Sequence, residues 1–140
     1  MVLTNSGSTY LTHKWVGRVV FLSLLLLFFT IPHTLEDFAT GEPAEAGVPA
    51  PLLSLVVSTI IFVQAIGLFW LGKKHRWGLY AHIAIGLFWP IASGFAQLPT
   101  IFNGELYRSG AISIGYVAGM IVIGILLCLS SIMALAKREI

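Results

Sequence analysis

The sequence predicts an all-α membrane protein, a bundle of four transmembrane helices with both termini on the cytoplasmic side. Three features predict it: the apolar content, four long apolar stretches, and the placement of the basic residues between them. Of the 140 residues, 57% are hydrophobic and 10% are charged, whereas ordinary soluble domains carry about 25% charged residues. A soluble domain of this length buries only about two-thirds of its chain surface. Lipid is therefore the expected solvent, and one domain is expected.

The predicted spans cover residues of about 15–33, 52–71, 77–98 and 111–136, within one transmembrane domain of residues 14–140. Residues 1–13 are polar and rich in Ser and Thr, so we expect a short N-terminal tail. About 20 helical residues cross a hydrocarbon layer of about 30 Å. Helices are required because unpaired backbone groups in lipid are costly, and barrel strands would alternate in polarity.

Each span has its own signals. The first contains the run VVFLSLLLLFFTI and reaches full length by including Pro32 and His33. A cleaved signal peptide is the less favoured interpretation, because IPHTLEDF follows instead of a small-x-small site. Pro49 and Pro51 suit the entry to the second helix, since Pro is favoured in a first turn, and Pro90 predicts a kink in the third. The short loop GKKHRW makes the second and third helices antiparallel neighbours.

The basic residues orient the bundle. If four helices alternate in direction, seven of the eight Lys and Arg residues fall on one side and only Arg108 falls on the other. Positive residues concentrate on the cytoplasmic side of membrane proteins, so loops 33–51 and 99–110 are expected on the outer side of a prokaryotic cytoplasmic membrane. The basic residues form no single stripe, which excludes nucleic acid and leaves the lipid bilayer as the expected partner.

Small residues mark helix faces that are expected to pack, because transmembrane helices associate through close backbone contact. Gly86, Pro90 and Gly94 recur at intervals of four in the third span, and the fourth contains Gly115-x-x-x-Gly119. Packing within one bundle is the favoured interpretation. A contact between copies of the chain through Gly115 and Gly119 is the alternative.

Polar and aromatic residues inside the spans are interpreted mainly as packing residues. Gln64 is expected to donate a hydrogen bond between helices, and His82 is expected to be packed and bonded. Phe88 and Trp89 are expected in the core, with contact to a ligand as the alternative. No acid lies deep in a span, which argues against a proton-coupled exporter. The lone Cys128 argues against a paired-cysteine enzyme.

The polar cluster at the outer end of the first span is the candidate site. His33, Glu36 and Asp37 are spaced i, i+3, i+4. If Pro32 begins a helical turn, as its preference for a first turn suggests, the three project within an arc of about 100°. A His with two carboxylates can hold a divalent metal ion or transfer protons, so these residues are the catalytic and metal-binding candidates. The alternative is the solvated start of a loop, in which the two acids cap a helix and are favoured by its dipole.

The stretch PHTLEDF resembles the signature of the small four-helix membrane proteins named for their HXXEE motif. Its second acid is Asp37 in place of Glu. That family also carries a Tyr-x-Pro-Gly segment, preceded by a His, before its last helix. Residues 107–110 read YRSG in that place, without the Pro, and Gln97 stands where the His is expected. The resemblance implies the four-helix layout and an outer site, and it implies no particular reaction.

The four-helix layout places further polar residues on the same side of the membrane as this cluster. The candidate ligand-binding residues are Gln97, Glu105, Tyr107 and Arg108. The predicted function is an outer-face polar pocket for a metal ion, a lipid head group or a small amphiphile, with enzymatic activity left open. An enzyme of this kind would use His33 as acid or base. The alternatives are an accessory subunit of a larger membrane complex, and a small transporter or lipid-modifying enzyme.

Arg108, the sole outer cation, is predicted to pair with Glu36, Asp37 or Glu105. A lipid phosphate is the alternative partner. Replacing Arg108 with Ala should then destabilise the protein only while the paired acid is present, with a coupling of about 0.5–3 kcal/mol. Double-mutant cycles on thermal stability measure that coupling. Strictly additive effects for all three acids would exclude the pair.

Overall fold

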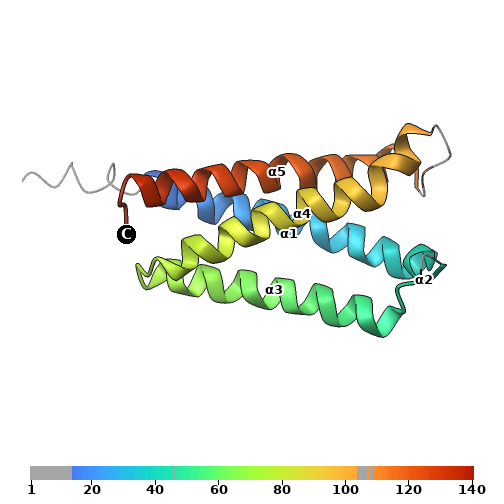
Figure 1. Cartoon of the computed structure of the whole chain (residues 1–140), viewed down its shortest axis with the longest axis horizontal. Helices are drawn as coiled ribbons and strands as arrows, with labels where there is room; N and C mark the ends of the chain where they lie inside the picture. The colour runs from blue at the N-terminus through green and yellow to red at the C-terminus, as the bar shows by residue number, and fades with distance from the viewer. Residues whose placement is uncertain (1–13, 46, 104–106, 108) are drawn as a thin grey trace, which may run out of the picture.

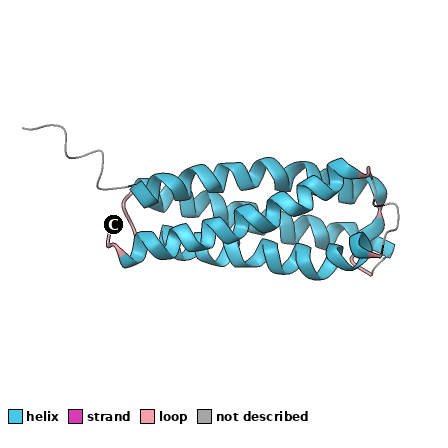
Figure 2. Cartoon of the chain, turned by 90° about the horizontal axis from the view of Figure 1, so that it is seen from above, coloured by secondary structure: helices cyan, strands magenta, loops and turns pink. Residues whose placement is uncertain are grey.

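The computed structural model describes residues 14–45, 47–103, 107 and 109–140, and this part of the chain folds as an all-helical bundle (Figures 1 and 2). Four long helices and one single-turn helix follow one another, which confirms the predicted four-helix fold class. The helices are α1 (Lys14–Thr40), α2 (Glu42–Glu45), α3 (Ala50–Gly72), α4 (Trp77–Phe102) and α5 (Ala111–Ala136). The predicted tail at residues 1–13 lies outside the described residues.

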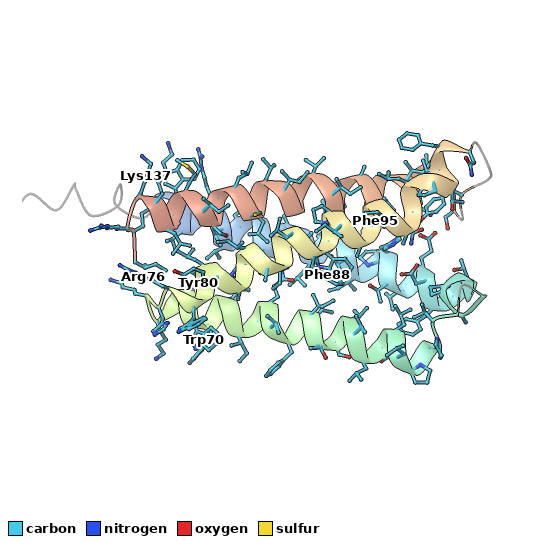
Figure 3. The ribbon with its side chains drawn as sticks, in the orientation of Figure 1. Trp70, Arg76, Tyr80, Phe88, Phe95 and Lys137 are labelled. Carbon is cyan, nitrogen blue, oxygen red and sulfur yellow. The ribbon has the colours of Figure 1, made fainter. Side chains whose placement is uncertain are left out.

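The four long helices have the length and surface of membrane spans. Each is long and apolar enough to cross a membrane, and lengths of 23 to 27 residues correspond to about 35–40 Å. Large apolar side chains cover the outside of the bundle, including Phe95 at 83% exposure and Phe102 at 80% (Figure 3). Exposed apolar surface on this scale is stable against lipid and not against water. The chain therefore has the architecture of an integral membrane protein.

The C-terminal end of α1 differs from the prediction. The helix runs through Pro32 without interruption and ends at Thr40, whereas a new helical turn was expected to begin at Pro32. Proline removes one backbone hydrogen bond, a loss that transmembrane helices tolerate. The predicted loop at residues 33–51 thus begins with two further turns of α1. These turns hold His33 and Asp37 rigidly at the end of the span.

Most of the Lys and Arg residues gather at one end of the bundle, which we call the basic end: Lys14, Lys73, Lys74, Arg76, Lys137 and Arg138. Figure 3 places Arg76 and Lys137 there, with Trp70 and Tyr80 nearby. The Glu139 carboxylate accepts hydrogen bonds from the backbone N–H groups of Trp15 and Val16, each at 2.9 Å. It therefore satisfies free donors in the first turn of α1, where the helix dipole favours a negative charge.

Glycines let α4 approach α3 and α5 closely. A Cβ on Gly86 would lie 2.7 Å from both the Gly124 carbonyl oxygen and the Cys128 nitrogen. A Cβ on Gly67 of α3 would lie 2.8 Å from Cε1 of His82. Side chains at these positions would force the helices apart, so the glycines set the distance between them.

The other predicted packing glycines divide into two groups. A Cβ on Gly119 would clash with the Phe29 ring, so this glycine packs against α1. A Cβ on Gly115 would meet nothing within 4 Å, and one on Gly94 would meet only Leu98 of its own helix at 3.9 Å. A side chain at Gly94 or Gly115 would therefore meet no neighbouring helix in the described chain.

A buried polar network joins α1, α3 and α4. The Gln64 amide donates to the Ser23 backbone carbonyl at 2.7 Å and to its hydroxyl at 2.9 Å. Nδ1 of His82 donates to the Gly78 carbonyl at 2.6 Å, so Nε2 accepts from the Ser23 hydroxyl at 3.0 Å. In the neutral imidazole, these two bonds place the proton on Nδ1. Gln64 and His82 are thus packing residues, in the roles expected of them.

Replacing Ser23 with Ala should destabilise the bundle, because it leaves Nε2 of His82 without a donor and removes one acceptor from Gln64. Hydrogen bonds between transmembrane helices contribute about 0.6–2 kcal/mol, so a loss of about 1 kcal/mol is expected. Equilibrium unfolding of the detergent-solubilised protein measures it. The matched control is Ser58→Ala, because the exposed Ser58 hydroxyl bonds only to its own helix. Equal stability of the two variants would contradict the structural role of Ser23.

Candidate functional site

A cavity of about 370 Å³ lies in the half of the bundle away from the basic end. Figure 1 shows α3 beside α4 at the basic end and progressively further from it toward the other end. The buried residues of α3 are Gln64, Gly67 and Leu71, all in the half nearest α4. The other half of α3 is therefore held less tightly, and the cavity opens there. Its volume is within the range of about 300–1,000 Å³ typical of small-molecule sites.

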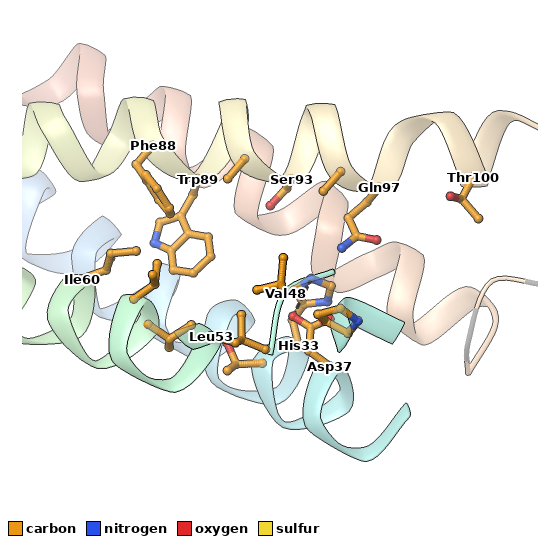
Figure 4. A pocket seen from close by; sticks show the side chains of 16 residues that line it. His33, Asp37, Val48, Leu53, Ile60, Phe88, Trp89, Ser93, Gln97 and Thr100 are labelled. Carbon is orange, nitrogen blue, oxygen red and sulfur yellow. Dashed lines mark ion pairs between the residues drawn. The ribbon is translucent and has the colours of Figure 1, made fainter. Parts of the chain in front are cut away.

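The inner part of the cavity is apolar. Side chains from α3 face side chains from α4 across it (Figure 4): Leu53, Val56, Val57 and Ile60 on one side, and Phe88, Trp89, Ala92 and Ala96 on the other. Space remains between the helices because α4 presents Ala92, Ser93 and Ala96 here, and none of them is large enough to fill it. Trp89 lies at the deep end, toward Ile60.

The outer part of the cavity is polar. His33 and Asp37 of α1 face Ser93 and Gln97 of α4, with Thr100 beyond them (Figure 4). His33 is only 3% exposed, and its Nε2 lies 3.9 Å from Oδ2 of Asp37. Polar groups removed from water in this way bind a matching ligand group more strongly than they would in solution.

Gln97 is held in place by Tyr107, from the connection between α4 and α5. The buried Tyr107 hydroxyl donates to Oε1 of Gln97 at 2.6 Å. This contact fixes the orientation of the amide at the rim of the cavity. The two residues thus lie together with His33 and Asp37, at one end of the bundle.

Glu36 does not face the cavity. At about 100° of rotation per residue, Asp37 lies about 40° from His33 around the helix, and Glu36 lies about 60° to the other side. Its carboxylate accepts hydrogen bonds from the Ser109 backbone N–H at 3.3 Å and from the Ser113 hydroxyl. Glu36 therefore lies at the start of α5, where a helix dipole stabilises an anion.

The structure thus divides the three predicted catalytic and metal-binding residues. His33 and Asp37 border the cavity, and Glu36 binds α5. Within the described chain, no group of three His, Cys, Asp or Glu side chains is placed to hold a metal ion. Two other predicted ligand-binding residues, Glu105 and Arg108, lie outside the described residues, and so does the predicted Arg108 ion pair.

Sequence reasoning did not identify the apolar wall of the site. The wall comes from α3 and from α4, where Phe88 and Trp89 were interpreted mainly as core residues, with ligand contact as the alternative. The available signal was the cluster of small residues Ala92, Ser93 and Ala96 beside Trp89 on α4. Its meaning depends on how α3 is placed, which the sequence pattern does not give.

Comparisons of the chain with protein-family models, curated proteins and solved structures find no match. The resemblance to the HXXEE-motif proteins therefore stays a prediction. The site is interpreted from its own geometry.

Glu36 and Asp37 should respond differently to loss of their charge. Glu36→Gln should lower the free energy of unfolding by about 1 kcal/mol, because it weakens the charge-assisted bonds at the start of α5. Asp37→Asn, one residue away, is the matched variant and should leave that contact intact. Equilibrium unfolding in detergent measures both. An unchanged stability of Glu36→Gln would contradict the role assigned to this residue.

Proposed function

We propose that this protein binds a small amphiphile in the cavity between α1, α3 and α4. The single observation that carries the proposal is the division of one cavity into a polar outer part and an apolar inner part. The polar head would lie among His33, Asp37 and Gln97. The hydrocarbon body would extend along the side chains of α3 and α4.

The chemistry of the outer part favours a head group that both donates and accepts hydrogen bonds. Asp37 supplies acceptors, Gln97 supplies an amide with both functions, and His33 supplies one of each when neutral. A hydroxyl or amide head matches this set. A carboxylate head would lie against the Asp37 carboxylate and would be disfavoured by like-charge repulsion.

The apolar part favours a hydrocarbon body that arrives from the bilayer. Burying apolar surface contributes about 25 cal/mol per Å², but a body already dissolved in lipid gains little of this on binding. Affinity must then come from close packing and from the hydrogen bonds at the head. This explains why a site in a membrane protein would combine a narrow apolar channel with several polar groups.

Sidedness and location belong to the same proposal. With the basic end in the cytoplasm, the head-group site lies near the outer surface of a prokaryotic cytoplasmic membrane. A catalytic use of the site would employ His33 as acid or base with Asp37 as its orienting carboxylate, because Glu36 is engaged with α5. The alternatives of an accessory subunit and of a small transporter stay predictions.

Filling the cavity should displace the amphiphile. Ala92 borders the cavity on α4, and Ala92→Phe places an aromatic ring in it. Lipid extraction and mass spectrometry of protein purified in mild detergent should find a small amphiphile on the wild type and at least about tenfold less on the variant. Such a loss corresponds to about 1.4 kcal/mol.

The matched control is Ala84→Phe, on the exposed surface of the same helix two turns away. It should retain the amphiphile at the wild-type level. The proposal is wrong if the wild type carries no small amphiphile, or if the two variants carry the same amount as the wild type.

A further inference from the structure

The Trp89 side chain has a buried hydrogen-bond donor that the described protein does not satisfy. The residue is 7% exposed, and its indole Nε1 has no acceptor among the residues described. An indole N–H is a donor only, and buried ones usually find a partner. Figure 4 shows the indole extending from α4 into the space toward α3, with its nitrogen on the side of Ile60.

The residues around this nitrogen explain why the protein leaves it unsatisfied. The neighbouring cavity wall is formed by Val57, Ile60 and Phe88, whose side chains have no acceptor. The buried polar network of Ser23, Gln64 and His82 forms its hydrogen bonds among these side chains and to the backbone. Ser93 borders the cavity one turn closer to the rim.

Water is a poor partner at this position. A buried water needs two to four polar partners, about three on average, and the deep end of the cavity offers the Trp89 N–H among aliphatic and aromatic side chains. A single donor does not hold a water molecule in such a site. A bound ligand with its own acceptor would satisfy the donor.

We infer that the amphiphile carries a second hydrogen-bond acceptor in its hydrocarbon body, and that this acceptor binds the Trp89 N–H. The inference rests on the proposed function and specifies the ligand class. Trp89 lies eight residues before Gln97 on α4, about 12 Å along the helix axis. Because the deep end of the cavity is apolar, the acceptor is a neutral oxygen, such as a ketone. It is located mid-chain, at about that distance from the head group.

A matched pair of probes tests the inference: octadecanol, and a keto-octadecanol whose ketone lies at mid-chain. Both offer a hydroxyl head and the same chain length. A hydrogen bond to the indole should make the keto compound bind the purified protein about two- to tenfold more tightly. Competition measured by native mass spectrometry gives the ratio directly.

Trp89→Phe keeps an aromatic ring and removes the donor, so the preference for the keto compound should fall to near unity while octadecanol still binds. The control is Trp70→Phe, because Trp70 lies near the basic end (Figure 3) and does not border the cavity. It should keep the preference. Equal binding of both alcohols to the wild type would overturn the inference and leave the amphiphile site standing, whereas binding of neither would overturn both.

The indole resonance gives a second readout that does not depend on affinity. The four Trp residues give separate N–H signals in the proton–nitrogen NMR spectrum, and the Trp89→Phe spectrum identifies the one that is lost. The keto compound should move that signal downfield, and octadecanol should not. A signal that responds identically to both probes would also overturn the inference.

Discussion

The close approach of α4 to α3 and α5 determines where the bundle is tightly packed and where it opens. Gly86 and Gly124 bring α4 against α5, while Gly67 and Gly78 bring it against α3 near the basic end. In lipid there is little hydrophobic drive between helices, so such contacts decide where helices are held together. Where they end, in the N-terminal half of α3, the helices diverge and the cavity begins. The site is thus a consequence of tight packing at one end and its absence at the other.

The buried polar residues serve either stability or the cavity, depending on where they lie along the bundle. At the tightly packed level, Ser23, Gln64 and His82 satisfy one another and join three helices. At the end away from the basic end, Glu36 stabilises the start of α5. His33 and Asp37 are left to border the cavity, on the adjacent face of the same helix. One helix therefore serves both stability and the proposed ligand site through residues only one position apart.

The fold followed from the sequence because its cause is local. Apolar runs of sufficient length must form helices in a bilayer, whatever their neighbours, and the ends of α5 lie at the predicted residues 111 and 136. The position where α1 ends could not be predicted from the sequence, because Pro32 is compatible both with the first turn of a helix and with the interior of a membrane helix. The site followed only in part. The spacing of His33, Glu36 and Asp37 indicated a polar cluster, but the positions of α3 and α5 around α1 determine which of them face the cavity.

An amphiphile enclosed between α3 and α4 should be visible directly in an experimental density map of the protein. The protein would be prepared in lipid nanodiscs from native membranes, without added ligand. We expect elongated non-protein density between the two helices, running from Gln97 to the indole of Trp89. A map in which α3 packs against α4 along its whole length, with protein side chains filling this space, would contradict this expectation.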